Sequence, residues 1–452
     1  MMLSHRSFPG APEIPGRLLH PVVLKGSRKK RPRSFENRKG THFMTHEEYM
    51  HLACCLALRG TGRVSPNPLV GAVIVKDGHI IGEGWHAKYG DLHAERNALK
   101  DCRKRGRDPA GADMYVTLEP CCHHGKQPPC TDALIEAGIG RVFMGSGDPN
   151  PRVAGKGVQI LRNHGIEVIE HVLEAECLAL NDVFFHYIRT GLPYVVLKYA
   201  MTLDGKIACH TGASRWVTGE EARAHVHRTR SRLTGIMVGV NTVIADDPLL
   251  TCRTEGGRNP VRIICDSRLR TPQDSQIVKT AREVPTILAT CETDPARQKP
   301  YLDAGCRIVT VPEKPRGTAG SPGKDSTMRG SVDLNILMQK LGSEEKIDSI
   351  LLEGGASLAW SALESGIINR VQAYIAPKVF GGADAKTPVG GTGFDTPDLA
   401  LKLKNLRLTR LGEDLLIEGD LSPADGSLPA EDSPPGKDSP PAGSGLTSEG
   451  GI

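Results

Sequence analysis

One segment of the chain carries the side chains that hold zinc in enzymes. His93 lies ahead of two cysteines, Cys121 and Cys130. One imidazole and two thiolates give a zinc ion three protein ligands and leave the fourth tetrahedral position for water, as in catalytic rather than structural sites. The two thiolates balance the charge of the ion, and water on such a site has a pKa near ~7. The expected chemistry is therefore metal-assisted hydrolysis at neutral pH.

A carboxylate lies beside these candidate ligands. Glu95 follows His93 by two residues at the expected start of a helix, so the two side chains point in different directions. A carboxylate so placed can take the proton of the water and pass it to the leaving group. His-x-Glu together with Pro-Cys is the signature of zinc-dependent nucleobase deaminases, in which hydroxide attacks an amidine-like ring carbon and ammonia leaves. We therefore expect Glu95 to be catalytic.

The spacing of the cysteines departs from that signature. Two residues usually separate them, whereas eight separate Cys121 from Cys130. A closed zinc site would need a fourth ligand, for which Cys122, His123 and His124 are available. Cysteines unrelated to any metal are the other alternative.

A second candidate site follows an apolar strand later in the chain. Glu353-Gly354-Gly355 comes directly after the apolar segment 347–352 and before a helical stretch. A strand that ends in Gly-Gly and leads into a helix N-terminus can receive a pyrophosphate, although the same pair is often a plain tight turn. The chain has no Gly-x-Gly-x-x-Gly in the right context, which counts against a Rossmann fold but does not exclude a nicotinamide cofactor.

The elements expected to position these residues alternate between helix and strand. In the first half we expect helices over 46–59, 94–105, 131–137 and 155–164, and strands over 71–75, 79–85, 114–118 and 141–145. Thr45 and Glu48 form a capping-box pattern, which sets the start of the first domain near residue 44. Strands separated by helices predict an α/β sheet covered on both faces.

The second half begins anew at Leu192-Pro193. Expected strands are 194–200, 235–240, 261–265, 286–289, 307–311, 347–352 and 371–376, with a helix over 219–232. We therefore expect two α/β domains, at 44–190 and 191–421. The Gly-, Pro- and charge-rich stretch 313–329 is expected to be an exposed insertion without a role.

The net charge of +5 over 452 residues is unevenly distributed. Ten Lys or Arg against two acids give the segment 1–43 a charge of +8, and one Lys against five acids gives the Pro/Gly/Ser-rich tail 422–452 a charge of −4. The body between them is therefore close to neutral, at +1. The basic segment is interpreted as a disordered extension, with a nucleic-acid arm and an organelle transit peptide as alternatives; the tail is expected to be disordered.

Composition excludes several classes of protein. The apolar share of 39%, together with 51 glycines, is that of a globular chain and excludes a wholly disordered one. No apolar run is long enough to span a membrane. Twelve cysteines are too few for a disulfide scaffold, and no secretory signal is recognised. These features favour a reducing compartment, and we expect a cytoplasmic protein.

Longer motifs resemble a known family. The segment 119–135, Glu-Pro-Cys-Cys-His-His-Gly-Lys-Gln-Pro-Pro-Cys-Thr-Asp-Ala-Leu-Ile, closely resembles the bifunctional deaminase/reductases of riboflavin biosynthesis, as do 65–75 and 82–86. The resemblance continues through 198–206, 214–218 and 239–253 and covers about 44–421. It implies a cytidine-deaminase-like α/β/α zinc domain followed by a dihydrofolate-reductase-like α/β domain that uses NADPH.

The resemblance also assigns residues. It implies that His93, Cys121 and Cys130 hold one Zn²⁺ per chain and that Glu95 is the proton shuttle. It implies pyrimidine contacts in the first domain at Asn67, His86, His123 and Lys126. It implies cofactor contacts at Ala200, Trp216, Thr242, Asp246, Ser267 and Gly355, and substrate contacts in the second domain at Ser214, Arg230, Leu250, Arg253 and Glu353. Cys122 and His124 receive no role.

Elementary chemistry agrees with some of these assignments. Arg230 and Arg253 are suited to clamp a phosphate bidentately. Ser267 beside Arg268 could read an adenosine 2′-phosphate, whereas Asp246 and Asp247, which precede Pro248, could instead be ordinary turn caps.

The function implied by the resemblance has two steps. They are hydrolytic deamination of 2,5-diamino-6-(5-phosphoribosylamino)pyrimidin-4-one and NADPH-dependent reduction of the resulting 5-amino-6-(5-phosphoribosylamino)uracil to the ribitylamino product. The expected partners are small phosphoribosyl pyrimidines, with no nucleic acid and no membrane, and we expect a homo-oligomer. Two alternatives are a nucleic-acid-editing deaminase that uses the basic segment 1–43, and a chain in which one half is catalytically inert.

Overall fold

The computed structural model describes residues 44–314 and 330–421. The expectations about the extension 1–43 and the tail 422–452, and most of the insertion 313–329, lie outside these residues. The flanks of that insertion pair as a short ribbon of β11 (Glu313–Lys314) and β12 (Ser331–Val332). Among the described residues, no helix combines the length and the apolar character needed to cross a membrane.

The first sheet has five strands. In spatial order they are β2 (His79–Trp85), β1 (Gly71–Lys76), β3 (Asp113–Leu118), β4 (Arg141–Ser146) and β5 (Glu167–Ile169). β1 pairs antiparallel with both β2 and β3, whereas β3, β4 and β5 run parallel. The carboxyl end of β3 leads toward Cys121, so the sheet itself positions one candidate zinc ligand.

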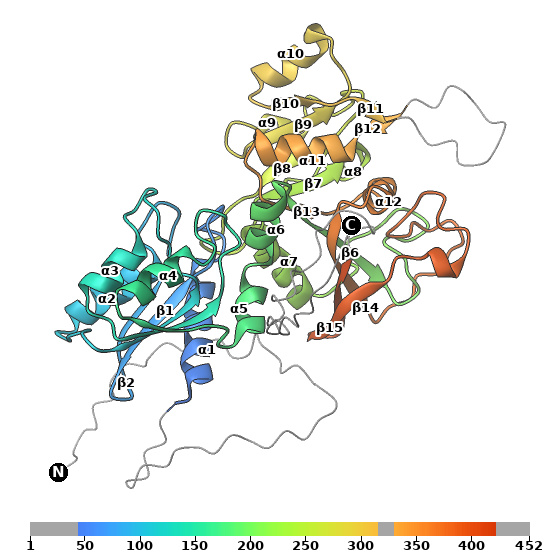
Figure 1. Ribbon diagram of the computed structural model, residues 1–452. Helices are drawn as coiled ribbons and strands as arrows, with labels where there is room; N and C mark the ends of the chain where they lie inside the picture. Colours follow the sequence, from blue (N-terminus) through green and yellow to red (C-terminus); the bar gives the residue numbers. More distant parts are fainter. Residues whose placement is uncertain (1–43, 315–329, 422–452) are drawn as a thin grey trace, which may run out of the picture. The chain divides into compact units, whose positions relative to one another are not determined.

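Helices cover both faces of this sheet, as predicted. They are α1 (His46–Ala57), the short η1 (Leu58–Gly60), α2 (Ala94–Lys104), α3 (Cys130–Glu136), α4 (Lys156–Asn163) and α5 (Glu174–Leu180). Helices α2, α3 and α4 lie on one face of the sheet and α1 and α5 on the other (Figure 1). Their buried side chains form a core with each face. The capping box at the start of α1 is present, since the Glu48 amide donates to Thr45 Oγ1 and the Thr45 amide to Glu48 Oε2.

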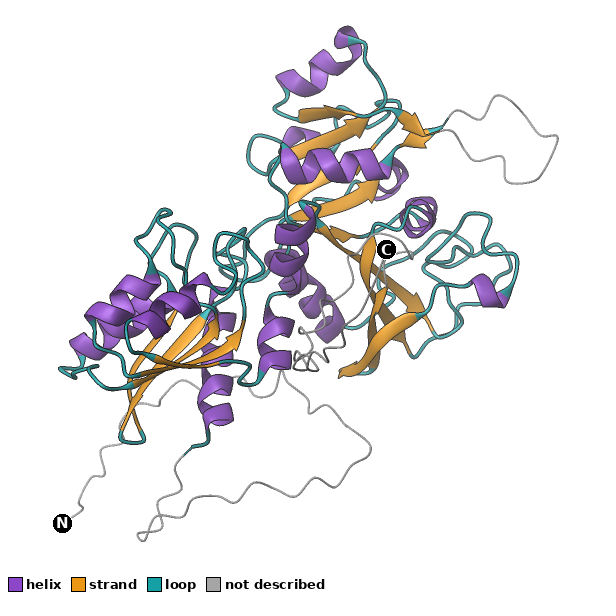
Figure 2. Cartoon of the chain, viewed as in Figure 1, coloured by secondary structure: helices purple, strands orange, loops and turns teal. Residues whose placement is uncertain are grey.

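The second sheet has nine strands. Their spatial order is β10 (Arg307–Thr310), β9 (Thr286–Thr290), β8 (Val261–Cys265), β7 (Gly235–Gly239), β13 (Ser349–Leu352), β6 (Tyr194–Thr202), β14 (Ile368–Ala376), β16 (Asp414–Leu421) and β15 (Leu403–Leu411). All pairings from β10 to β14 are parallel, and β16 and β15 add an antiparallel hairpin at one edge (Figure 2).

The remaining helices pack against this second sheet or connect its strands. They are α6 (Asp182–Thr190), α7 (Glu220–Arg232), α8 (Val240–Asp246), α9 (Gln276–Lys279), α10 (Pro295–Asp303), α11 (Leu334–Ser343), α12 (Ala356–Glu364) and the short η2 (Pro397–Leu399). One apolar core lies under α11 and α12, and another lies under α8, α9 and α10 on the opposite face. The strands between them are therefore buried on both faces, which explains their continuous apolar sequences.

Helix α6 contacts the second sheet rather than the first. Its first residue, Asp182, pairs with Arg232 at 2.6 Å and with Arg370 of β14 at 2.7 Å. These two cations outweigh the effect of burial and lower the pKa of the Asp182 carboxyl. The sequence patterns did not predict α6, α5, β5 or the β15–β16 hairpin.

Candidate active sites

The three candidate zinc ligands meet at the amino-terminal ends of two helices. His93 is the residue before α2, and Cys130 is the first residue of α3. Cys121 lies in the loop after β3, where its carbonyl oxygen accepts the backbone N–H of Cys130 at 3.0 Å. His93 Nδ1 lies 3.4 Å from the sulfur of each cysteine. The fold therefore brings together all three residues that the sequence singled out.

Their spacing fits a tetrahedral zinc ion. The three ligand atoms lie within 4.8 Å of one another. Zinc bonds of ~2.3 Å to sulfur and ~2.0 Å to nitrogen imply an N···S separation of about 3.5 Å in a tetrahedron, which matches the 3.4 Å observed. A hydrogen bond from Cys130 lowers the pKa of the Cys121 thiol, so this sulfur is prepared to act as a thiolate.

The closed-site alternative is not supported. Within 44–314 and 330–421, the cluster that could hold a metal at this place contains His93, Cys121 and Cys130 and no fourth ligand. The sulfur of Cys122 instead lies 3.6 Å from the carbonyl oxygen of Arg152. The three-ligand arrangement leaves a coordination position available, as hydrolysis requires.

Glu95 is buried beside this cluster. It lies in the first turn of α2 and is 3% exposed. Burial raises the pKa of its carboxyl, and the nearby Cys121 thiolate raises it further. A carboxyl group whose pKa moves toward neutrality is suited to accept a proton and then release it.

Two of the expected pyrimidine contacts lie next to His93. Asn67 Nδ2 is 3.2 Å from His86 Nε2, and His86 Nδ1 lies 3.1 Å from the Leu92 carbonyl oxygen. The rings of His86 and His93 meet edge to face, with centroids 5.3 Å apart. Burial lowers the pKa of His86, so this ring is neutral at pH 7.

The other two lie in the insert between the cysteines. His123 Nδ1 is buried and has no hydrogen-bond partner among the described residues, which marks it as a polar atom available to a ligand. Lys126 Nζ lies 4.0 Å from the centroid of the Tyr89 ring. The insert is fastened to the loop before His93, because Gln127 Nε2 donates to the Gly90 carbonyl oxygen at 3.0 Å.

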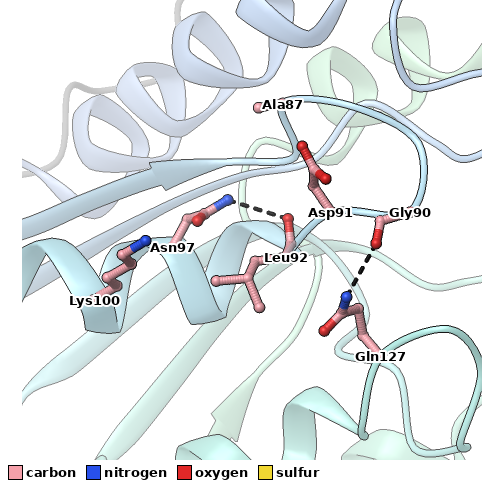
Figure 3. A pocket seen from close by; sticks show the side chains of 7 residues that line it. All are labelled: Ala87, Gly90, Asp91, Leu92, Asn97, Lys100 and Gln127. Carbon is pink, nitrogen blue, oxygen red and sulfur yellow. Dashed lines mark hydrogen bonds between the residues drawn. The ribbon is translucent and has the colours of Figure 1, made fainter.

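Residues of that loop line a pocket of about 300 Å³ (Figure 3). Its lining residues are Ala87, Gly90, Asp91, Leu92, Asn97, Lys100 and Gln127. None of them is a candidate zinc ligand, so the catalytic site is identified from the ligand cluster rather than from this cavity. Asn97 Nδ2 donates to the Leu92 carbonyl oxygen at 3.1 Å, which fixes the chain immediately before His93.

In the second sheet, the expected cofactor contacts follow the carboxyl ends of neighbouring strands. Ser267 comes after β8, Thr242 lies in α8 after β7, and Gly355 comes after β13. Helices α8 and α12 leave the adjacent strands β7 and β13. Such an edge is where parallel α/β sheets bind their ligands. Asp246 lies one turn beyond Thr242 on the same face of α8.

The glycine turn at this edge is compact. Gly354 has φ 132° and Gly355 φ 86°, values that favour glycine. A Cβ on Gly354 would lie 3.5 Å from Thr242 Oγ1. The turn therefore packs against α8 and directs the amino end of α12 toward the shared edge, as a pyrophosphate site requires.

Arg230 and Glu353 form a buried ion pair. Arg230 Nε lies 2.7 Å from Glu353 Oε1 and Nη2 lies 2.9 Å from Oε2, while Nη1 donates to the Thr251 carbonyl oxygen at 3.0 Å. Burial alone would raise the pKa of Glu353, but Arg230 and Lys198 outweigh it and lower the pKa to about 2. The guanidinium group of Arg230 thus already binds a protein carboxylate. The sequence, which suggested a phosphate clamp, contained no signal for this pairing.

The other expected contacts differ in their exposure. Ser214, Trp216 and Arg253 are exposed, and Ala200 of β6 is partly buried. Leu250 is 5% exposed and packs in the core with α8 and α9, so its side chain faces the interior.

Of Asp246 and Asp247, the two residues considered as turn caps, Asp247 makes a capping contact. Its carboxylate accepts the Gln276 amide at 2.8 Å. Asp246 is thereby left exposed at the end of α8.

Comparisons with known proteins agree with both halves of this description. The model of the cytidine and deoxycytidylate deaminase zinc-binding region matches residues 44–146, and that of the RibD C-terminal domain matches 193–417. A riboflavin biosynthesis protein RibD from Actinobacillus pleuropneumoniae is 52% identical over 375 residues, which are 83% of this chain and 95% of that protein. The chain belongs to the RibD family.

Solved structures of RibD proteins share the fold. Acinetobacter baumannii RibD superimposes with a TM-score of 0.72 at 35% identity, covering 83% of this chain and 99% of that one. A Thermotoga maritima diaminohydroxyphosphoribosylaminopyrimidine deaminase/5-amino-6-(5-phosphoribosylamino)uracil reductase gives 0.69 at 38% identity with the same coverage.

Membership of the RibD family establishes the general activity. The protein is a bifunctional deaminase and reductase of riboflavin biosynthesis, with a zinc-binding deaminase site and a reductase domain that uses a nicotinamide cofactor. The predicted pair of a cytidine-deaminase-like and a dihydrofolate-reductase-like domain is confirmed, and the alternative with one inert half has no support.

Lys198, near the second site, received no role from the sequence. Lys198 of β6 lies 3.6 Å from Glu353 Oε2, and its side chain is 16% exposed. Its place in the 198–206 motif is the feature of the sequence that could have indicated a role.

Proposed function

We propose that the chain carries out two consecutive reactions on one phosphoribosyl pyrimidine. The first converts 2,5-diamino-6-(5-phosphoribosylamino)pyrimidin-4-one and water to 5-amino-6-(5-phosphoribosylamino)uracil and ammonia. The second reduces the ribosyl group of that product to a ribityl chain. The observation that carries the proposal is the cluster of three potential zinc ligands, His93, Cys121 and Cys130, beside Glu95, in a chain that also has the reductase fold.

For deamination, His93, Cys121 and Cys130 would hold the zinc ion. Bound zinc lowers the pKa of a water molecule to near ~7 and so provides the nucleophile. Glu95 accepts the proton of that water and delivers it to the departing amine, for which its buried carboxyl with a raised pKa is suited.

Neighbouring side chains are proposed to orient the substrate of this step. Asn67 and His86 form a hydrogen-bonded pair beside His93, where they can orient the pyrimidine ring. His123 and Lys126 are proposed to bind its phosphoribosyl group, because one offers an unpartnered ring nitrogen and the other a cation.

For reduction, the cofactor is proposed to lie along the carboxyl edge of β8, β7, β13 and β6. Gly355 and Thr242 receive the pyrophosphate, with Asp246 at the far end of α8, and Ala200 and Trp216 contact the nicotinamide half. Ser267 and the exposed Arg268 select NADPH through its 2′-phosphate.

The chemistry of reduction is hydride transfer to C1 of the ribosylamino group in its open imine form. With NADPH bound, its hydride would form the new C–H bond, a proton would complete the amine, and the cofactor would leave in its oxidised form. We propose that Ser214, Arg253 and the loop backbone at Leu250 hold the substrate. Arg230 acts with Glu353, whose carboxylate it fixes at the site. The protein contributes mainly by positioning the two partners.

The domain limits are proposed to lie close to those read from the sequence. We propose a deaminase domain that begins at residue 44 and a reductase domain that ends near 421. The contacts of Asp182 with Arg232 and Arg370 favour counting α6 with the reductase domain rather than ending the first domain at 190.

A homo-oligomer is proposed from the edge of the second sheet. Among the described strands, β15 pairs with β16 alone, and two of its leucines, Leu406 and Leu408, are 65% and 66% exposed. An edge strand with exposed apolar side chains is suited to pair with a second copy.

A cytoplasmic location is proposed from the thiols. All twelve cysteines are free, including Cys54 and Cys177, whose buried sulfurs lie 3.6 Å apart in a hydrogen bond and not in a disulfide.

Isotope transfer tests the proposed second step. Purified protein is supplied with the deaminated substrate and NADPH that carries deuterium at both C4 positions of its nicotinamide. The proposal expects one deuterium at C1 of the ribitylamino product by mass spectrometry. Product without deuterium, or no product, would show that the proposed reduction is wrong.

A further inference from the structure

An exposed tryptophan is held in place by charged side chains from outside its own loop. Trp216 is 58% exposed, and it lies in the loop that connects β6 to α7. Arg223 of α7 lies 4.7 Å from its ring centroid, and Nη1 of the same guanidinium donates to the Thr218 carbonyl oxygen at 2.7 Å. The Gly219 amide donates to the buried carboxylate of Asp414 at 2.7 Å. These contacts fix the end of the loop that enters α7.

Lys378 fixes the same loop at Trp216 and Val217. Its Nζ donates to the carbonyl oxygens of Trp216 at 3.1 Å and of Val217 at 2.8 Å. Hydrogen bonds from an ammonium group are stronger than neutral ones, and two of them on successive carbonyls restrict the backbone that carries the indole. Lys378 therefore restrains the backbone of Trp216 itself.

Lys378 is itself anchored next to the end of β6. The Leu203 amide donates to the Lys378 carbonyl oxygen at 2.8 Å. Two residues further on, the Phe380 and Gly381 amides donate to the two carboxylate oxygens of Asp204, at 3.1 and 2.7 Å. The segment after β14 is thus tied to the loop after β6, and from there Lys378 extends to the Trp216 loop.

We infer that Lys378 is a positioning residue for the reductase. It does not touch the cofactor; it orients Trp216, so that the indole meets the nicotinamide half of NADPH in one fixed position. This inference rests on the proposed contact between Trp216 and the cofactor. It adds a determinant of cofactor affinity that lies 162 residues away in the sequence.

The location of Lys378 makes the inference testable without unfolding the protein. Lys378 is exposed, and exposed side chains outside the core contribute little to global stability. Lys378→Met removes both hydrogen bonds and keeps the apolar stem. Lys378→Arg keeps a cation that can reach both carbonyls. Lys386→Met is a matched control, because it removes the same charge from an exposed lysine eight residues further along.

The experiment measures KM for NADPH and kcat of the reductase with the deaminated substrate. For Lys378→Met we expect KM for NADPH to rise about tenfold, as for the loss of a charge-assisted contact, and kcat to fall less. Lys378→Arg should restore KM to within about threefold of the parent value, and Lys386→Met should leave it unchanged. The deaminase activity and the melting temperature of the same preparations should not change, which shows that each variant is folded.

A double variant separates this inference from the proposed function. Trp216→Ala alone should raise KM for NADPH, and adding Lys378→Met should raise it no further, because the lysine acts through the indole. If Trp216→Ala raises KM and Lys378→Met does not, the inference is wrong and the proposed cofactor site stands. If Trp216→Ala has no effect, the proposed cofactor contact is wrong, and the inference fails with it. Additive effects, or a parallel loss of deaminase activity and of melting temperature, would show a merely structural lysine and overturn the inference.

Discussion

The buried pair of Arg230 and Glu353 gives a prediction whose magnitude follows from the structure. The ordinary carboxyl pKa of 4.5 and the value of about 2 in the folded protein differ by an amount that corresponds to about 3 kcal/mol of favourable interaction. Removing one partner of a buried pair costs a similar ~3–5 kcal/mol, because the other charge is left without compensation. We therefore expect Arg230→Met to lower the free energy of unfolding of the reductase domain by about 3 kcal/mol at neutral pH.

The pH dependence of this loss has a definite sign. The folded-state pKa of Glu353 lies below its unfolded value. The pairing with Arg230 therefore stabilises the folded state fully above about pH 4.5, and this stabilisation is lost as the pH falls toward about 2. Without Arg230, burial raises the pKa of the carboxyl against the pull of Lys198 alone. Glu353 then gains a proton at mildly acidic pH, and the difference in free energy of unfolding between parent and variant becomes smaller.

The assay is urea unfolding followed by tryptophan fluorescence. The chain has three tryptophans, and Trp85 is the one in the first sheet, so a Trp85→Phe background restricts the signal to Trp216 and Trp360. Arg228→Met, an exposed arginine on the same helix, is the matched control and should cost less than about 0.5 kcal/mol. A loss below about 1 kcal/mol for Arg230→Met, or an equal loss at about pH 7.5 and pH 5, would refute the reasoning.

Three further predictions concern the two sites. Glu95→Gln should reduce deamination by several orders of magnitude in an ammonia-release assay and leave NADPH oxidation with the deaminated substrate unchanged, since Gln cannot carry the proton; equal loss of both activities would point to misfolding instead. Cys130→Ser should abolish stoichiometric zinc in elemental analysis, whereas Cys122→Ser, whose sulfur faces a carbonyl oxygen, should retain it; zinc loss from both would contradict the three-ligand site. Gly355→Ala should raise KM for NADPH at least about tenfold, because its φ of 86° strains any residue with a Cβ; an unchanged KM would separate the turn from the cofactor.

The zinc site could be read from the sequence because its signal is local. The His-x-Glu pair and the Pro-Cys segment lie at the ends of short elements whose periodicity was clear, and the structure brings His93, Cys121 and Cys130 together. The glycine turn after β13 was readable for the same reason, since two glycines follow an apolar strand.

The remaining features depend on contacts between distant residues. The ion pair of Arg230 and Glu353 joins positions 123 residues apart, and neither local sequence predicts it. Leu250 was expected to contact the substrate, and its sequence did not indicate that its side chain packs in the core with α8 and α9, which leaves its backbone for that contact. The β15–β16 hairpin was missed because β15 is exposed along most of its length, so its leucines do not alternate between core and solvent in the usual way.

The central claim is that one chain deaminates and then reduces the same pyrimidine at two separate sites. The most direct measurement supplies purified protein with the diamino substrate and NADPH and follows ammonia and NADPH together. We expect one ammonia released and one NADPH oxidised per substrate. Removal of zinc with a chelator should stop both, and adding the deaminated substrate should restore NADPH oxidation alone. NADPH oxidation that stays absent after that addition, or ammonia release that survives removal of zinc, would contradict the account.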